Sequence, residues 1–196
     1  MIRVAVIDGH PAIRAGVEAI LARTGDVVVV AATSGDPHEV EHTLYRTTPD
    51  VVVVEDAPGH LDGVALARAI KEQPPAPGVV LYADGVDATQ VATAMLAGAD
   101  ALLDTRSDAS ALVAAVRAAA QGRPVFPELD GASRAELASR LPGAEQDILR
   151  MRLAAISPRE IARLLRVDSQ TLRARLAVMI DRLRRPGAGA PSAVSP

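Results

Sequence analysis

Short apolar runs alternate with amphipathic stretches along the first 122 residues of the chain. The apolar runs are rich in β-branched residues, so each one predicts a buried strand. They cover residues 3–7, 27–31, 51–54, 79–82 and 101–103. The stretches with apolar residues at helical spacing cover residues 11–23, 37–47, 61–72, 88–97 and 107–121. The pattern therefore predicts five consecutive βα units.

The predicted strands are apolar throughout instead of alternating between apolar and polar positions. This pattern is typical of a parallel sheet that helices cover on both faces. We therefore expect an α/β domain over residues 1–122, built on a doubly wound parallel sheet. In such a fold the site lies at the carboxyl ends of the strands, where the strand order reverses.

The pattern changes after Gly122. Residues 123–140 begin with a proline-containing stretch and predict a linker, with a short helix over 132–139. Residues 141–185 predict a small all-α domain. Its predicted helices cover residues 145–155, 158–165 and 169–184. Residues 186–196 are small, rich in Pro and Gly and without a hydrophobic face, which predicts a disordered tail.

The two parts of the chain differ in charge. Residues 1–131 carry 9 Lys/Arg and 18 Asp/Glu, whereas residues 132–185 carry 12 Arg and 6 Asp/Glu. A basic end on an acidic body indicates binding to a polyanion such as nucleic acid. A solvated, arginine-rich helix surface would give the same counts, and charge alone does not separate the two interpretations.

Composition excludes several classes of protein. Hydrophobic residues make up 49% of the chain and charged residues 23%, which indicates a globular protein. The absence of Cys excludes disulfides, thiolate metal sites and cysteine nucleophiles. The aromatic share of 2% argues against stacking platforms for single-stranded nucleic acid. No apolar run is long enough to span a bilayer and no signal peptide is evident, so we expect a cytoplasmic protein with no membrane partner.

Four stretches of the chain carry a resemblance to a known family. They read VAVIDGHPAIRAGVEAIL, PDVVVVEDAPGHLDG, the GAD of Gly98–Asp100, and ILRMRLAAISPREIARLLRVDSQTLRARL. In residues and spacing, from Ile2 to about Arg184, the chain resembles a NarL/FixJ-type response regulator, with a receiver domain followed by a LuxR-type helix-turn-helix. The resemblance implies a flavodoxin-like strand order 2-1-3-4-5 and a regulator of transcription that binds double-stranded DNA. It implies neither enzymatic activity nor a cofactor.

The family's phosphorylation pocket is altered at the positions that bind magnesium and accept the phosphoryl group. Receivers place two acids after the first strand, and here these positions are Asp8 and Gly9, so one magnesium ligand is missing. The phosphoacceptor position after the third strand is Glu55, and the adjacent Asp56 adds another acid.

The positions that respond to the phosphoryl group differ as well. The hydroxyl residue after the fourth strand corresponds to Tyr82, the lysine after the fifth strand to Thr105, and the aromatic switch residue to Leu102. Phosphoryl transfer needs cations that neutralise developing charge on the phosphoryl oxygens. We therefore expect a degenerate receiver that does not accept phosphate by the usual route.

Two interpretations of Glu55 remain open. Its longer side chain could place a carboxylate near a phosphoryl oxygen's position and hold an active-like state. Alternatively, the pocket is vestigial, and the domain pairs with a protein or small-molecule effector regardless of phosphate. We favour the second interpretation because the moving parts of the switch are missing. We expect no metal here: Asp8, Glu55 and Asp56 could bind a hard cation weakly, but a solvated acidic rim explains them.

One motif suggests zinc chemistry. Residues 38–42 read HEVEH and match the HExxH pattern: His38 and His42 share a helix face, and Glu39 could act as a base. The motif is short, it lies away from the strand ends, and His60 is only a candidate third ligand. We interpret it as a polar helix face, and His10 as a structural residue.

The basic end predicts a helix-turn-helix. Ser157 and Pro158 are typical of a helix start, residues 166–168 of a tight turn, and Ser169 or Asp168 of the next cap. Isoleucine, alanine and leucine residues of the first helix are expected in the core: Ile161, Ala162, Leu164 and Leu165. Leu172, Leu176, Met179, Ile180 and Leu183 give the second helix a buried stripe.

This stripe leaves Gln170, Thr171, Arg173 and Arg175 exposed near the start of the second helix. Arginine can pair bidentately with guanine and glutamine with adenine, so these residues are candidates for base contacts. Three further residues are candidates for contacts to the DNA backbone: Arg159, Arg163 and Arg166.

Two departures from the LuxR-type pattern concern assembly and the turn between helices. The sequence at Arg185–Gly187 breaks the chain where a last, pairing helix is expected in the family. We therefore expect a homodimer through the receiver domain. Ala155 stands where the family favours glycine.

The sequence thus favours a phosphorylation-independent, DNA-binding transcription regulator. The alternative is a receiver-like interaction or ligand-sensing module without productive DNA binding.

Overall fold

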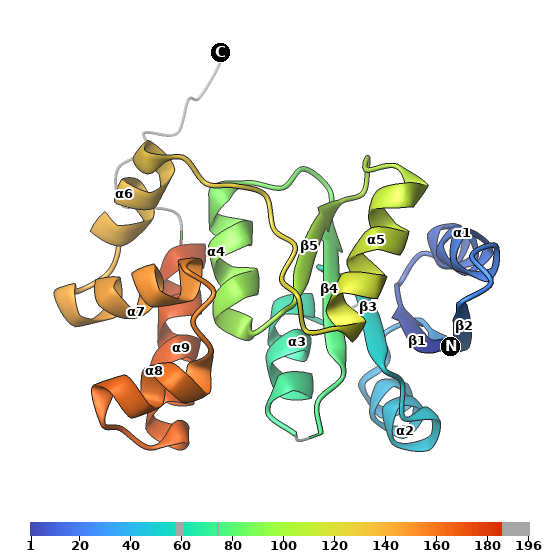
Figure 1. Ribbon diagram of the computed structural model, residues 1–196, viewed down its shortest axis with the longest axis horizontal. Coiled ribbons are helices and arrows are strands. Elements are labelled where there is room, and N and C mark those ends of the chain that lie inside the picture. The colour runs from blue at the N-terminus through green and yellow to red at the C-terminus, as the bar shows by residue number, and fades with distance from the viewer. Residues whose placement is uncertain (58–60, 74, 186–196) are drawn as a thin grey trace, which may run out of the picture. The chain divides into compact units, whose positions relative to one another are not determined.

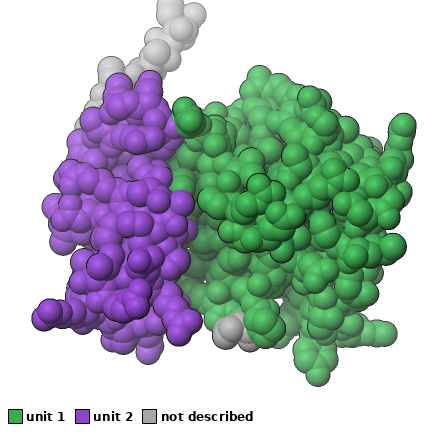
Figure 2. Space-filling view, in the orientation of Figure 1, with its two compact units in different colours: residues 1–128 green, residues 129–196 purple. Residues whose placement is uncertain are grey.

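The computed structural model describes residues 1–57, 61–73 and 75–185. The chain forms two compact units, residues 1–128 and residues 129–196 (Figure 2), here called the N-terminal and the C-terminal unit. The tail predicted over 186–196 and the candidate ligand His60 lie outside the described residues.

The N-terminal unit is built on a five-stranded parallel sheet in the order β2-β1-β3-β4-β5 (Figure 1). The strands are β1 (Ile2–Ile7), β2 (Val27–Thr33), β3 (Val51–Glu55), β4 (Gly78–Ala83) and β5 (Ala101–Asp104). This arrangement confirms the predicted doubly wound α/β fold and its strand order.

A helix follows each strand of the sheet. The helices are α1 (Pro11–Ala22), α2 (Pro37–Thr47), α3 (Gly63–Lys71), α4 (Ala88–Ala97) and α5 (Ala109–Ala120). On one face, α1 and α5 pack against alternate strand residues; this core includes Val4, Val6, Val17, Leu21, Val51, Val53, Tyr82, Ala115 and Val116. The intervening strand residues, such as Ile7 and Val54, are also fully buried, because α2, α3 and α4 cover the opposite face (Figure 1).

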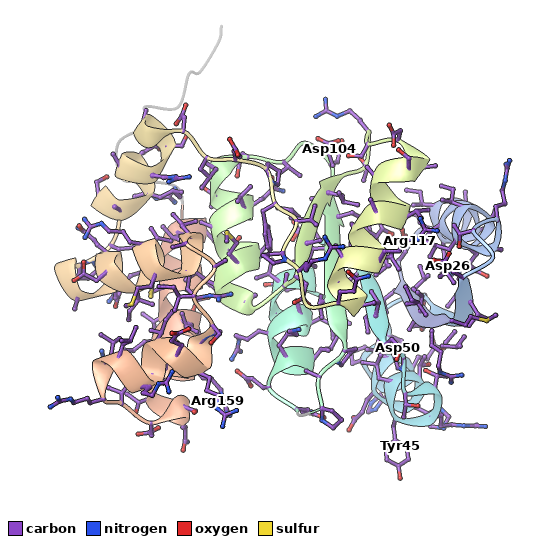
Figure 3. The ribbon with its side chains drawn as sticks, viewed as in Figure 1. Asp26, Tyr45, Asp50, Asp104, Arg117 and Arg159 are labelled. Carbon is purple, nitrogen blue, oxygen red and sulfur yellow. The ribbon has the colours of Figure 1, made fainter. Side chains whose placement is uncertain are left out.

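Ion pairs fasten the helices to the sheet at its rim. Arg117 of α5 holds Asp26, which precedes β2, with Nη2 and Oδ1 2.8 Å apart (Figure 3). This hydrogen-bonded partner lowers the pKa of Asp26 to about 2. Near the opposite edge of the sheet, before β5, the carboxylate of Asp100 accepts hydrogen bonds from Lys71 of α3 and from the backbone N–H of Val79.

The residues after α5 divide between the two units. Val125 lies beside β5: its N–H donates to the Asp100 carbonyl at 2.8 Å, and its carbonyl accepts from the Leu102 N–H at 3.1 Å. Residues 123–128 thus belong to the N-terminal unit. The remainder of the predicted linker forms helix α6 (Gly131–Ser139), which belongs to the C-terminal unit.

The C-terminal unit consists of α6 and three further helices in its described residues. They are α7 (Gly143–Leu153), α8 (Pro158–Leu165) and α9 (Ser169–Arg184). Their bounds agree with the predicted helices to within two residues at each end. Among all helices in the described part of the chain, none combines the length and apolarity needed to cross a lipid bilayer.

Candidate functional site

The first candidate site lies at the carboxyl ends of β1, β3 and β4 in the N-terminal unit. Asp8 and Gly9 follow β1, Glu55 ends β3 and Tyr82 lies in β4. Since β3 lies between β1 and β4, the fold brings these positions to one edge of the sheet. We call the group of Asp8, His10, Glu55 and Tyr82 the strand-end pocket.

Tyr82 points into the core beneath this pocket and closes on the first acid. Its hydroxyl donates a hydrogen bond to Oδ2 of Asp8, and both residues are buried. Burial, followed by this hydrogen bond and the negative charge of Asp8, raises the pKa of Tyr82 well above its usual value. The phenol therefore stays protonated and remains a hydrogen-bond donor to Asp8.

Glu55 is held by the loop after β1. Its Oε2 accepts a hydrogen bond from the Gly9 N–H at 3.0 Å, and its Oε1 lies 2.9 Å from Nδ1 of His10. The same imidazole nitrogen is 3.5 Å from Oδ1 of Asp8, which also accepts the backbone N–H of His10. His10 therefore lies against both acids, a contact that its interpretation as a structural residue did not predict. The sequence signal for this contact is the place of His10 directly after the Asp8–Gly9 pair.

The remaining predicted pocket positions make other contacts. The backbone of Asp56 links β4 to α3: its N–H donates to the Tyr82 carbonyl at 2.9 Å, and its carbonyl accepts from the Gly63 N–H at 2.7 Å. Thr105 is exposed, and its N–H donates to the Ala83 carbonyl at 3.0 Å. Within the described residues, no side-chain hydrogen bond joins Thr105 to the acids of the pocket.

The HEVEH motif lies on α2, which begins shortly after the carboxyl end of β2. Oε2 of Glu39, the first of the motif's two acids, accepts a hydrogen bond from the hydroxyl of Thr33 at 2.8 Å and so ties the helix to the end of β2. Among the described residues, the one cluster with metal-ligating geometry is Asp8, His10 and Glu55, which includes no residue of α2.

The second candidate site is the helix pair α8–α9 of the C-terminal unit. The Ser157 side chain caps α8 by accepting the Glu160 N–H at 3.2 Å. The chain then turns at Arg166, which adopts a left-handed backbone with φ of 54°. Asp168 caps α9, accepting the N–H and the hydroxyl of Thr171, each at 2.7 Å. These hydrogen bonds also lower the pKa of Asp168.

The face that α9 presents follows from its buried stripe. Leu172, Leu176, Met179, Ile180 and Leu183 are all buried. Gln170, Arg173 and Arg175 are exposed, together with Arg159, Arg163 and Arg166, whereas Thr171 is half-buried and its hydroxyl is used in the cap. Arg159 extends from α8 at the edge of the C-terminal unit (Figure 3).

One core residue of α8 was predicted wrongly. Ile161 and Ala162 are buried as expected, but Leu164 is 59% exposed and Leu165 is half-buried. An eight-residue helix has room for one buried stripe, and Ile161 and Ala162 occupy it. Leu164 therefore lies on the outer side of the stripe.

The comparisons with known proteins give the family. A model for the response regulator receiver domain matches residues 4–117, more than half of the chain. The chain belongs to the response regulators. VraR of Staphylococcus aureus strain NCTC 8325, a response regulator protein, is 25% identical over 189 residues, which cover 93% of this chain and 90% of VraR.

Two solved structures extend the likeness to the fold. A LuxR-family two-component response regulator from Aurantimonas sp. SI85-9A1 has a TM-score of 0.60 at 26% identity, covering 71% of this chain and 96% of that one. RcsB, in a structure of two dimers bound to two parallel DNAs, has a TM-score of 0.59 at 19% identity, covering 93% and 91%. At that identity RcsB shows the fold alone. The LuxR-family structure, together with the match to the receiver domain, supports the likeness of this response regulator to the NarL/LuxR type.

The strand-end pocket of this response regulator does not fit magnesium. Mg²⁺ prefers near-octahedral oxygen ligands and keeps several waters. Gly9 supplies no carboxylate, Tyr82 engages Oδ2 of Asp8, and the imidazole of His10 lies against Asp8 and Glu55 where oxygen ligands would be needed.

The C-terminal end of α9 is closed by the chain that precedes α7. The guanidinium of Arg140 donates hydrogen bonds to the carbonyls of Leu183 and Arg185, the latter at 2.8 Å. These are among the carbonyls that a helix leaves without partners inside the helix. The response regulator therefore closes the end of α9 with Arg140, at the point where the family's last helix was expected to begin.

Ala155 adopts a left-handed backbone with φ of 59°, although it has a Cβ. That conformation costs a Cβ-bearing residue about 1–2 kcal/mol, and glycine avoids the cost but loses more entropy on folding. We therefore expect Ala155→Gly to raise the free energy of unfolding by about 0.5–1 kcal/mol, as measured by urea denaturation. Ala154→Gly is the matched control: its φ of −86° suits alanine, so that variant should be less stable than the wild type. An Ala155→Gly protein that is no more stable would contradict the argument.

Proposed function

We propose that this response regulator is a DNA-binding regulator of transcription whose receiver unit acts without phosphorylation. The observation that carries the first part is the exposed N-terminal end of α9. Gln170, Arg173 and Arg175 project from a helix whose opposite face is fully packed. A recognition helix needs this combination, because its first turns enter the major groove while its back holds the domain together.

The exposed side chains suit duplex DNA. Arg173 and Arg175 can donate paired hydrogen bonds to guanine, and Gln170 can pair with adenine. Among the described residues, neither guanidinium is held by an ion pair, so both are free to reach a base edge. Thr171 is assigned a smaller part, because Asp168 already holds its hydroxyl.

The arginines of α8 and the turn suit contacts to the DNA backbone. Arg159, Arg163 and Arg166 are exposed and carry like charge along one short segment. Contacts between arginine and phosphate fix the register of a protein on DNA without reading its sequence. Binding should accordingly weaken as salt rises, because the phosphates regain their counterions.

The proposal of phosphorylation independence is supported by the strand-end pocket. Tyr82 satisfies one oxygen of Asp8, and Gly9 and His10 satisfy Glu55. The lysine position is Thr105, which is exposed and contributes no cation. A phosphoryl group would therefore meet two carboxylates without the lysine that stabilises its transfer. The guanidinium of Arg14, which lies nearby, is bonded to the backbone carbonyl of Asp8 at 2.6 Å.

A homodimer through the N-terminal unit would complete the function. Two copies would place two α9 helices on half-sites about one DNA turn apart. We assign dimerisation to the receiver because Arg140 closes the end of α9, where the family's pairing helix was expected to begin. A protein or small-molecule effector, in place of phosphate, would then control assembly.

Selection from random duplexes tests DNA binding directly. The full-length protein is incubated with a random duplex library at low salt, and bound duplexes are recovered and sequenced. The proposal expects enrichment of a motif with two related half-sites. Absence of any enrichment would favour the alternative, an interaction or ligand-sensing module without productive DNA binding.

Treatment with a phosphoryl donor tests the receiver. We expect acetyl phosphate with magnesium to leave the intact mass and the DNA affinity unchanged, because Thr105 replaces the lysine and Gly9 replaces one magnesium ligand. A receiver with the usual aspartate and lysine, treated in parallel, verifies the donor. A stoichiometric mass increase on Glu55 or Asp56 would refute this part of the proposal.

A further inference from the structure

We propose that Asp8, His10 and Glu55 form a binding site for a divalent first-row transition-metal ion such as Zn²⁺. The inference deepens the proposed function by giving the effector of the strand-end pocket a chemical class. The inference rests on the proposed function in one respect, namely that the pocket is not used for phosphoryl transfer. The group that makes the pocket unsuitable for magnesium is the imidazole of His10, and imidazole is itself a ligand for transition-metal ions.

The three ligand atoms are spaced as a shared ion requires. Nδ1 of His10 is 2.9 Å from Oε1 of Glu55 and 3.5 Å from Oδ1 of Asp8, and all three atoms lie within 4.8 Å of one another. Bonds of about 2.0–2.2 Å to one zinc ion place neighbouring ligand atoms about 3–3.5 Å apart. Small side-chain rotations are therefore enough to bring all three atoms onto one ion.

Each carboxylate has its other oxygen held by a separate donor. The Tyr82 hydroxyl bonds Oδ2 of Asp8, and the Gly9 N–H bonds Oε2 of Glu55 at 3.0 Å. Metal-binding carboxylates characteristically receive such outer hydrogen bonds, which fix the direction of the coordinating oxygen. In this pocket they leave Oε1 of Glu55 and Oδ1 of Asp8 facing the imidazole. Oδ1 also accepts the backbone N–H of His10, which fixes its position further, so the donor set is oriented before an ion arrives.

Burial and charge agree with this assignment. Asp8 is fully buried, the Glu55 side chain is 16% exposed, and the His10 side chain is 65% exposed. A divalent ion would neutralise two carboxylates, one of them with no access to solvent. The exposed imidazole leaves a path for entry and an open side where water completes the coordination.

The donor types select the metal. Imidazole suits zinc, copper, nickel and iron, whereas magnesium and calcium prefer oxygen ligands alone. One nitrogen and two carboxylate oxygens therefore favour the transition ions over the abundant hard cations. The same set distinguishes this pocket from the HEVEH motif on α2, where Glu39 is hydrogen-bonded to Thr33.

Zinc titration of the untagged, chelator-treated full-length protein tests the site. We expect isothermal titration calorimetry to give one Zn²⁺ per chain, with binding retained in millimolar MgCl₂ and a raised melting temperature. His10→Asn should weaken zinc binding at least tenfold, and Glu55→Gln is a second variant should the first fail to fold. Tyr82→Phe, which keeps the ring but loses the orienting hydroxyl, should weaken it about 10–100-fold.

The control variant carries His38→Asn and His42→Asn together and should bind zinc as the wild type does. Three outcomes would overturn the site: no zinc binding by the wild type, binding that survives both His10→Asn and Glu55→Gln, or binding lost in the control. A simple ion pair between His10 and Glu55 gives the first of these. Failure here leaves the duplex selection and the acetyl phosphate result unaffected, so the two proposals fail separately.

Discussion

Replacing Arg173 and Arg175 together by alanine is expected to abolish specific retention of a selected duplex. Each good bidentate contact to a base discriminates by about 1–3 kcal/mol. Losing both should therefore weaken specific binding by about 30-fold or more, since about 1.4 kcal/mol corresponds to a factor of ten. Both side chains are exposed, so the fold should survive. Fluorescence anisotropy with the selected duplex and with a scrambled one measures the effect.

The matched control removes the same charge elsewhere. Arg123 and Arg134 are also exposed, on the segment after α5 and on α6, and their double alanine variant has the same net charge. It should keep the wild-type preference for the selected duplex over the scrambled one. Equal losses in the two double variants would mean that α9 contributes only general electrostatic attraction, and would contradict the assignment of base contacts.

Gly63→Ala should destabilise the N-terminal unit severely. Gly63 begins α3, and a Cβ at this position would lie 2.2 Å from the Glu55 carbonyl oxygen and 2.7 Å from that of Asp56. Both obstacles are backbone atoms at the end of β3, so neither can rotate away. Overpacking in a core costs about 1–3 kcal/mol and occasionally more, and a backbone overlap of this size belongs at the upper end. Urea denaturation monitored by circular dichroism measures the loss.

Gly16→Ala is the control for this change. A Cβ on Gly16 meets nothing within 4 Å, and the residue lies inside α1 at a helical backbone. Alanine there should stabilise the protein by about 0.5–1 kcal/mol, because it lowers the entropy of the unfolded chain. We therefore expect the free energy of unfolding to fall in Gly63→Ala and to rise in Gly16→Ala. A Gly63→Ala protein as stable as the wild type would show that α3 and the pocket can separate.

The fold could be predicted from the sequence because each local signal agrees with the final structure. Apolar runs such as residues 51–54 are buried on both faces of the sheet, as a continuous pattern requires. Helix starts are marked by capping residues that make their predicted bonds, including Ser157 and Asp168. The buried stripe of α9 follows directly from helical spacing.

The pocket could be predicted only in part, since its contacts join residues far apart in the chain. Strand order places Asp8, Glu55 and Tyr82 together, and the family's pattern names those positions. The direction of the Tyr82 hydroxyl and the position of the His10 imidazole depend on side-chain packing across three strands. A periodic pattern reports which face a residue lies on, not which polar partner it meets there.

The boundary between the units could not be predicted for the same reason, because contacts between residues far apart in the chain decide it. Prolines in residues 123–130 indicate an irregular segment, but they give no sign that Val125 pairs with β5. Likewise, the sequence does not show that α6 belongs with the helices after it, because the contact of Arg140 with the end of α9 spans more than 40 residues.

The pairing of Val125 with β5 has a consequence for the behaviour of the protein at high concentration. An unprotected outer strand offers a row of free amide and carbonyl groups onto which another molecule can add its own strand. Val125 occupies such groups at Asp100 and Leu102, and the prolines on either side of it prevent the added segment from extending the ladder. The segment that leads to the C-terminal unit thus covers part of the β5 edge, which leaves fewer free backbone groups for a strand of another molecule to pair with.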